Sequence, residues 1–251
     1  MNDTNQVGVL GNGFVGKILK RYYPNAPVYD IKDAPNTLEE VLAKRYIFLA
    51  YNLLDNCLSE SSLQSVYNYC EKMKDGTVVI IKSTFVPSTA DKIQDKFPLL
   101  KIIYNPEFLT EATAWEDFTK PIFQILGITR QSESEVNDIF SMLPTAPIKR
   151  VISVKDAEVL KHAKNSYYAL KVIWFNQLYD ACQQIGADYE TTKEILSHDP
   201  WIGDSHNVIF HRGYRGFGGK CLSKDPLNFT KVASIPILDK AIEINNELKK
   251  M

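Results

Sequence analysis

The sequence predicts an α/β fold followed by an all-helical region, and three observations lead to this class. Up to about Arg150, short apolar runs of strand character alternate with stretches of helical period, which is typical of a parallel sheet wrapped by helices. A glycine-rich turn follows the first of these runs. From Val154 one long helical pattern replaces the alternation. We therefore expect two domains, residues 1–150 and 151–251.

Six short apolar runs are predicted to be strands. They are Val7–Leu10, Pro27–Tyr29, Tyr46–Tyr51, Thr77–Ile81, Lys101–Tyr104 and Ile122–Ile128. The segments between them have helical period, so a doubly wound sheet with helices on both faces is expected.

The second region is dominated by one helical pattern that runs from Val154 to about Glu190. Its segment Tyr167–Leu178 is apolar nearly all round, so this helix must be buried on several sides. A break at Gly186, Ala187 and Asp188 precedes a shorter helix that ends at about Ser197. A polar, glycine-rich loop follows at His198–Gly219. Two last helices are predicted, at about Lys224–Val232 and Ile237–Lys250.

Composition excludes several functional classes. With 29 basic and 30 acidic residues, the chain has no field that would attract nucleic acid or an anionic membrane. Cys57, Cys70, Cys182 and Cys221 show neither a C-x-x-C spacing nor a paired framework, which favours reduced thiols and no metal site. The N-terminus lacks the pattern of a signal peptide or a membrane span. We predict a cytoplasmic protein.

The glycine-rich turn after the first strand predicts a dinucleotide site. It reads Gly11, Asn12, Gly13, Phe14, Val15, Gly16 and opens a helical pattern, the context in which G-x-G-x-x-G marks a Rossmann fold. Asp30 ends the second strand, where a carboxylate binds ribose hydroxyls and repels a 2′-phosphate. The pattern therefore favours NAD over NADP, against the alternative of a glycine turn that binds nothing.

One cysteine lies in a run suited to covalent catalysis. Cys221 follows Gly216, Gly218 and Gly219, and a lysine and a carboxylate stand three and four residues beyond it. Glycines let a substrate approach the backbone, and a nearby cation favours the nucleophilic thiolate. The alternative is an ordinary buried cysteine.

Three further motifs accompany these two. They are Lys82-Ser83-Thr84-Phe85-Val86-Pro87, the run Asn105 to Glu111, and the pair Lys161 and Asn165 at i, i+4 on one helix face. In this order the five motifs resemble the UDP-glucose/GDP-mannose dehydrogenase family. Members of that family oxidise the C6 alcohol of a sugar nucleotide to a carboxylate with two molecules of NAD.

The resemblance implies a role for each matching residue. Cys221 looks like the nucleophile, Lys161 and Asn165 like the oxyanion pair, Asp225 and Thr84 like the groups that organise water, and Glu107 like the acid/base group. Contacts to NAD are implied for Gly11–Gly16, Asp30, Thr84, Glu111 and Lys224. Contacts to the substrate are implied for Glu107, Phe108, Leu109, Lys161, Asn165, Arg212, Tyr214, Arg215 and Gly218.

The chain departs from the family pattern at several places. Asn52-Leu53 replaces a Thr-Pro pair, Trp201 stands where an arginine reaches a neighbouring subunit's substrate, and Lys220 stands beside the nucleophile in place of a small residue. The loop Asp204–Arg215 is longer than usual, and we expect Arg212 and Arg215 to bind the diphosphate. Family members continue into a further, UDP-binding domain. The resemblance thus predicts a short form whose lid is supplied by another subunit or chain, or is dispensed with for a different substrate.

Three functions stay open on the sequence alone. The first is a four-electron nucleotide-sugar dehydrogenase, most simply one that converts UDP-glucose to UDP-glucuronate. The second is a two-electron hydroxyacid dehydrogenase, which would need no thiol. The third is a non-catalytic NAD-binding remnant. The apolar helix surface at Tyr167, Leu170, Val172, Ile173, Trp174, Phe175 and Leu178 predicts a homodimer, as the family resemblance also implies.

Overall fold

The computed structural model describes residues 4–51, 60–211 and 213–250, and the chain divides into two compact units, Met1–Lys161 and His162–Met251. The sequence placed the boundary at residue 150. The division falls later because the first turns of the long helix, at Val154 and Ala157, pack into the core of the sheet unit. Below, the first unit is called the sheet unit and the second the helical unit.

The sheet unit is built on seven strands. They are β1 (Val7–Leu10), β2 (Val28–Tyr29), β3 (Tyr46–Leu49), β4 (Val78–Ile81), β5 (Lys101–Tyr104), β6 (Phe123–Ile128) and β7 (Ile148–Ser153). Their order is β2-β1-β3-β4-β5-β6-β7. The strands from β1 to β5 are parallel, β6 pairs antiparallel with β5, and β7 runs parallel with β6. The predicted α/β class is confirmed.

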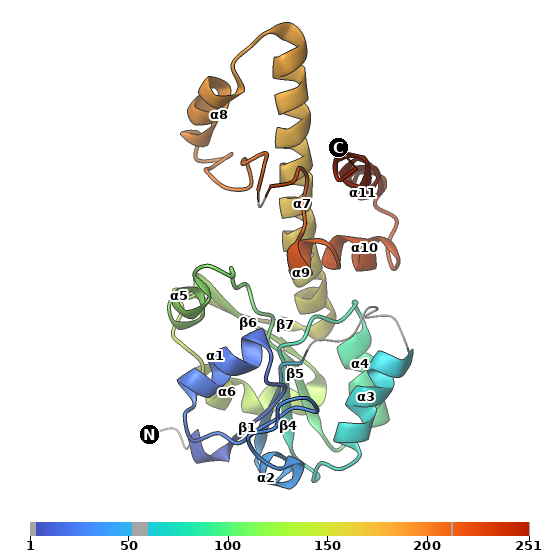
Figure 1. Cartoon of the computed structure of the whole chain (residues 1–251). Coiled ribbons are helices and arrows are strands. Elements are labelled where there is room, and N and C mark those ends of the chain that lie inside the picture. The colour runs from blue at the N-terminus through green and yellow to red at the C-terminus, as the bar shows by residue number, and fades with distance from the viewer. Residues whose placement is uncertain (1–3, 52–59, 212, 251) are drawn as a thin grey trace. The chain divides into compact units, whose positions relative to one another are not determined.

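Helices cover both faces of this sheet (Figure 1). They are α1 (Phe14–Tyr22), α2 (Leu38–Leu42), α3 (Glu60–Cys70), α4 (Thr89–Lys96), α5 (Ala114–Thr119) and α6 (Val136–Met142), with 3-10 helices at Thr4–Gln6 and Arg130–Glu135. Successive residues of β3 face opposite sides. Phe48 shares a buried cluster with Leu19 of α1, and Ile47 shares another with Ile93 of α4. Both faces of the sheet are therefore buried, which explains why the sequences of the strands are continuous apolar runs.

The helical unit continues from the long helix. Its helices are α7 (Val154–Ile185, begun in the sheet unit), α8 (Tyr189–Ser197), α9 (Gly219–Leu222), α10 (Asp225–Thr230) and α11 (Pro236–Leu248). The predicted break after α7 is present, with Gly186 at φ +74° and Asp188 accepting hydrogen bonds from the Glu190 and Thr191 amides at the start of α8. Ile173 of α7 packs with Ala241 of α11.

Candidate active site

The glycine-rich turn joins β1 to α1 at the point where the strand order reverses. Gly11 has φ +108°, and a Cβ there would overlap the backbone of Ala50. A Cβ on Gly16 would overlap the Gly11 carbonyl oxygen, whereas one on Gly13 would meet nothing within 4 Å. The turn is thus closed toward the protein and open on the Gly13 side, which leaves the N-terminus of α1 accessible to a phosphate group.

Asp30 lies directly against this turn. Its Oδ2 accepts a hydrogen bond from the Asn12 amide at 2.9 Å, and its Oδ1 accepts one from the Lys32 amide at 2.9 Å. The Asn12 side chain donates to Asp33 Oδ2 at 2.8 Å. Each Asp30 oxygen keeps a further lone pair, so the half-buried carboxylate can still accept from ribose hydroxyls. The open glycine turn and this carboxylate fit NAD.

The other two turn residues lie at the start of α1. Phe14 is 44% exposed, and Val15 is partly buried and packs against the core of the sheet unit.

We expect Asp30→Ala to weaken NAD binding about tenfold or more and to narrow the preference over NADP, because it removes both the hydroxyl acceptor and the charge that repels a 2′-phosphate. Titration with each cofactor by fluorescence checks this. Asp33→Ala is the matched control, since Asp33 also binds Asn12 but is not predicted to contact the ribose. Equal affinity for the two cofactors in the unsubstituted protein would contradict the prediction.

The loops after β4 and β5 carry the next predicted residues. Thr84 is half-buried, and its neighbour Ser83 donates to the Tyr51 carbonyl at 2.8 Å. Glu107, Phe108 and Leu109 are half-buried in the second loop, where the Leu109 amide donates to Glu107 Oε2 at 3.2 Å. Further along that loop Glu111 is exposed. Both loops extend from the carboxyl ends of adjacent parallel strands, the edge at which open α/β sheets bind ligands.

Glu107 and Lys161 form the one buried ion pair between predicted catalytic residues in the described part of the sheet unit. Lys161 Nζ lies 2.8 Å from Glu107 Oε1 and also donates to the Glu107 carbonyl at 2.7 Å. The two side chains are only 3% and 12% exposed. The Lys161 ammonium also lies 5.6 Å from the centre of the Phe108 ring. Three contacts therefore fix this cation against the loop after β5.

Lys82 is a titratable residue of this region to which the sequence assigned no role. It directly follows the last residue of β4, stands two residues before Thr84, and is buried. Burial lowers the pKa of Lys82 to about 7, Glu107 opposes that shift, and Lys161 adds to it. A lysine directly after four apolar strand residues was the available signal, because such a position predicts burial.

Lys82 predicts a pH dependence of stability. Because its pKa is lower in the folded than in the unfolded protein, the unfolded chain binds more protons between about pH 7 and pH 10.5. The free energy of unfolding should therefore rise with pH across that window, by at most about 1.4 kcal/mol per pH unit for one group. Urea unfolding of the protein and of Lys82→Met at several pH values measures the difference. If the free energies of unfolding of the two proteins changed with pH in the same way, the lowered pKa of Lys82 would be refuted.

In the helical unit Asn165 and Asp225 are in contact. Asn165 Nδ2 donates to Asp225 Oδ2 at 2.5 Å, and Asp225 is 1% exposed. His162, one turn earlier on α7, lies with Nδ1 3.1 Å from the Asp225 carbonyl oxygen and stacks on Phe229. The start of α10 is thus held by its side chain and its backbone. His162 had not been singled out in the sequence.

Cys221 is exposed and reduced. It lies in the short helix α9, a helix that the sequence analysis did not predict, and the Lys224 amide donates to its carbonyl at 3.1 Å. Before it, Gly216 has φ +81°, and a Cβ on Gly218 would overlap the Tyr214 hydroxyl. The glycines therefore permit a turn that presents the thiol to solvent, four residues before the fixed carboxylate of Asp225.

The polar loop before Cys221 is held by two cations of α7 and the loop. Lys171 donates to the carbonyls of Ile202 and Gly203 at 2.7 and 3.2 Å. Arg215 is buried, pairs with Asp180 at 2.8 Å and donates to the Asn176 carbonyl at 3.1 Å. These contacts hold the Arg215 guanidinium within the helical unit, and its expected phosphate contact stays a prediction.

Several expectations fall on residues outside the described part of the chain. They are the Asn52-Leu53 replacement, the Arg212 phosphate contact and the Cys57 thiol. Trp201 is described and is 90% exposed. Among the described residues there is no group of His, Cys, Asp and Glu side chains that could hold a metal ion. No helix in the described ranges is long and apolar enough to cross a bilayer.

Two family profiles match the chain. The NAD binding domain of the UDP-glucose/GDP-mannose dehydrogenase family matches residues 51–143, and the central domain of that family matches residues 155–247. The glycine-rich turn precedes the first matched range.

Curated relatives agree with the profiles. The chain is 29% identical to a UDP-glucose 6-dehydrogenase of Rickettsia bellii over 81% of this chain and 48% of the relative. It is 31% identical to that of Rickettsia typhi, over 72% of this chain and 43% of the relative. The chain thus spans about half the length of the curated relatives it matches.

Solved structures share the fold. A UDP-glucose dehydrogenase from Pyrobaculum islandicum superposes with a TM-score of 0.78 at 24% identity, over 96% of this chain and 67% of that chain. A UDP-D-ManNAc dehydrogenase from Pyrococcus horikoshii gives 0.81 at 17% identity, over 96% and 68%. With both domain profiles matched in order and relatives at about 30% identity, the chain belongs to the UDP-glucose/GDP-mannose dehydrogenase family.

Proposed function

We propose that the protein is an NAD-dependent nucleotide-sugar 6-dehydrogenase that converts a C6 alcohol to a carboxylate, with UDP-glucose as the substrate. The observation that carries this proposal is the pairing of predicted catalytic residues from distant motifs, Lys161 with Glu107 and Asn165 with Asp225. The substrate is suggested by the relatives in Rickettsia, which are named UDP-glucose 6-dehydrogenases.

The cofactor site in this proposal consists of the turn Gly11–Gly16 and Asp30. Bound there, NAD would accept one hydride in each of two oxidations. The protein's part is to hold the pyrophosphate at the N-terminus of α1 and the ribose on the Asp30 carboxylate. Thr84, Glu111 and Lys224 are the further cofactor contacts that the family resemblance implies.

Cys221 performs the covalent step. After the alcohol has lost a hydride and a proton, the thiolate sulfur of Cys221 adds to the C6 aldehyde carbon, and the carbonyl π electrons move to oxygen. Lys161 and Asn165 stabilise the oxyanion by charge and by a hydrogen bond. Loss of a second hydride leaves a thioester on Cys221. A two-electron oxidation would require none of this.

Hydrolysis completes the reaction. Water, oriented by Thr84 and Asp225, adds to the thioester carbon and gives a proton to Glu107. The C–S bond then breaks, and Cys221 leaves as thiolate. Over the whole reaction one alcohol, two NAD⁺ and one water give one carboxylate, two NADH and three protons.

The deciding experiment counts NADH per substrate with a panel of UDP- and GDP-sugars. Two NADH per molecule and a uronate product are expected with UDP-glucose. One NADH per molecule would favour the two-electron alternative. Tight NAD binding without any turnover would instead favour the non-catalytic remnant.

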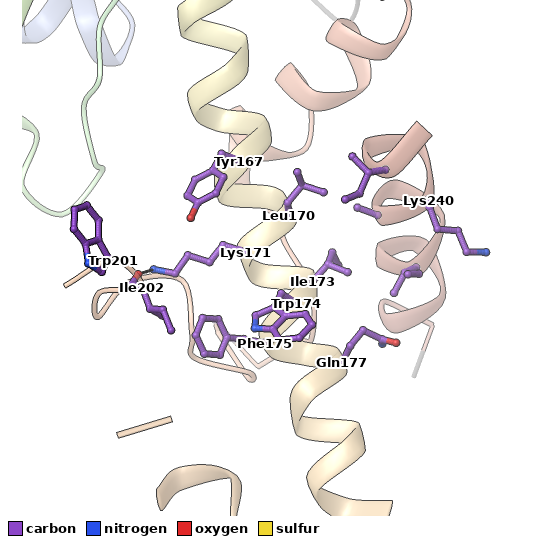
Figure 2. Close-up of a pocket in the computed structure, with 13 residues that line it drawn as sticks. Tyr167, Leu170, Lys171, Ile173, Trp174, Phe175, Gln177, Trp201, Ile202 and Lys240 are labelled. Atoms are coloured by element: carbon purple, nitrogen blue, oxygen red, sulfur yellow. Dashed lines mark hydrogen bonds between the residues drawn. The ribbon is translucent and has the colours of Figure 1, made fainter. Parts of the chain in front are cut away.

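The same proposal includes a homodimer formed through α7. Trp174 and Tyr167 are 62% and 57% exposed on this helix, and they border an apolar groove of about 470 Å³ in the helical unit. Figure 2 shows Leu170, Ile173 and Trp174 projecting from α7 along the groove. The groove is lined by Tyr167, Leu170, Lys171, Ile173, Trp174, Phe175, Gln177, Trp201, Ile202, Ile237, Lys240, Ala241 and Ile244. A second copy would remove this surface from water.

We expect Trp174→Glu to weaken self-association at least about a hundredfold, the scale of an interface hot spot. Light scattering over a concentration series measures the change from dimer to monomer. Ile185→Glu is the control, since Ile185 is 78% exposed on the same helix but does not line the groove. A monomeric unsubstituted protein at high micromolar concentration would refute the dimer.

A further inference from the structure

Glu158 is a buried carboxylate of α7 to which the mechanism above assigns no role. It is 0% exposed, and its oxygens accept hydrogen bonds from the backbone amides of Ser88 and Ala90 at 2.6 and 2.9 Å. Those amides belong to the N-cap residue and the second residue of α4. A helix begins with amides that have no partner inside the helix, so Glu158 supplies the acceptors that this helix lacks.

The start of α4 needs such an external acceptor. Ser88, its N-cap residue, has φ +75°, a left-handed conformation, and its hydroxyl makes no capping hydrogen bond. For a residue with a side chain this conformation is sparsely populated and persists only where surrounding contacts impose it. When it is ionised, the Glu158 carboxylate also lies at the positive end of the helix dipole. Glu158 thus holds Ser88 in place together with the Lys92 amide, which donates to the Ser88 carbonyl at 3.3 Å.

Fixing Ser88 also fixes Thr84. The two residues are joined by Phe85, Val86 and Pro87, of which Phe85 is 1% and Val86 5% exposed. On the other side of Thr84, Ser83 is bonded to the β3 end of the sheet. The short segment between these two anchors has little freedom, so the position of Thr84 depends on both.

Glu158 also couples this loop to the catalytic helix. Residues three apart on a helix share a face, and Lys161 follows Glu158 by three. One turn of α7 therefore binds two loops, the Thr84 loop through Glu158 and the Glu107 loop through Lys161. These loops follow the adjacent parallel strands β4 and β5.

We propose that Glu158 is a positioning residue, which holds Thr84 in its working place by fixing the first turn of α4 to the helix that carries Lys161. The role in turnover rests on the function proposed above, whereas the anchoring does not. Burial raises the pKa of Glu158 to about 8, and the amides of Ala90 and Ser88 oppose that shift. The hydrogen bonds to the loop are thus what favours the ionised carboxylate.

Amide hydrogen exchange tests the anchoring without any turnover. In Glu158→Ala the amides of Ser88 and Ala90 should exchange at least about tenfold faster, since each loses its hydrogen-bond acceptor. In Glu158→Gln, which keeps the shape and one acceptor oxygen, the exchange rates should lie between those of Glu158→Ala and of the unsubstituted protein. This variant provides the test if the alanine variant does not fold. Unchanged exchange at both amides in a folded variant would overturn the proposal.

A double-variant cycle tests whether Glu158 acts through Thr84. Glu158→Gln should lower kcat about ten- to a hundredfold, the cost of a small misplacement, and should add less than about twofold in a Thr84→Val background. Glu135→Gln is the matched control: it removes another buried carboxylate of the sheet unit, whose partners are Arg45 and Lys101, and it should leave kcat within about twofold of the unsubstituted protein.

Two kinetic outcomes would overturn the proposal, namely losses from Glu158→Gln and Thr84→Val that multiply, and an equal loss in Glu135→Gln. If the unsubstituted protein forms no NADH with any nucleotide sugar, the proposed function fails. The exchange experiment then still decides whether Glu158 fixes the Thr84 loop.

Discussion

Cys221→Ala is expected to abolish acid formation while it leaves NAD binding within about twofold. Without the sulfur, no thioester can form, and removal of a nucleophile from a covalent enzyme costs at least about a thousandfold in kcat. The thiol is exposed in the helix α9, so its loss should not disturb the core. Single-turnover assays that quantify uronate and NADH, with a separate NAD titration, measure both effects.

Ser223→Ala provides the control for Cys221, because Ser223 is exposed two residues further along the same segment. It should keep nearly full activity. Alkylation with iodoacetamide should label Cys221 in preference to the buried Cys70 and Cys182, and burial raises the pKa of the Cys70 thiol to about 12. Two NADH per sugar from Cys221→Ala would exclude the covalent mechanism.

Lys161→Ala should be the most destabilising of the active-site substitutions and should nearly abolish turnover. It leaves the carboxylate of Glu107, only 12% exposed, without its counter-ion, a change that typically costs about 3–5 kcal/mol. It also removes the cation assigned to the oxyanion, which is worth about a hundred- to a thousandfold in kcat. Urea unfolding at pH 7 and steady-state kinetics measure the two losses separately.

A double substitution separates the two effects of Lys161. Lys161→Met with Glu107→Gln removes both charges, so stability should return to within about 1–2 kcal/mol of the unsubstituted protein, while turnover should stay low. Lys155→Ala, at an exposed position of the same helix, should change neither quantity. A single Lys161→Ala variant with unchanged stability would show that the pair contributes nothing to the fold.

Much of the fold was predictable because periodicity reports burial. The six strands predicted from apolar runs are all present. β7 was missed because all its side chains except Ile152 are exposed, so it has no apolar run to detect. The reversed direction of β6 was also not predictable, since strand direction depends on the path of the connection and not on local composition.

The candidate site was predictable as a set of residues but not as a set of contacts. Motif order pointed to Lys161 and Glu107, yet no spacing rule pairs positions 54 residues apart. The expected phosphate contact of Arg215 came from its place in the long loop, and the ion pair that Arg215 forms with Asp180 could not be predicted from that place. Glu158 escaped notice because a charged residue within a helical pattern is usually exposed, whereas the four apolar residues before Lys82 were a signal of burial that the sequence analysis did not use.

The anchoring of the loop before Cys221 has a consequence for how such enzymes can diverge. Lys171 binds its start, Ile209 is buried in its middle, and Arg215 binds its end. Extending a flexible loop between fixed points is inexpensive, since each doubling of length costs only about 0.6 kcal/mol. We therefore expect the arc between Ile209 and Arg215 to accept added residues with little loss of folding free energy. Grafting experiments that seek a new sugar specificity should begin at this arc and leave its three anchors intact.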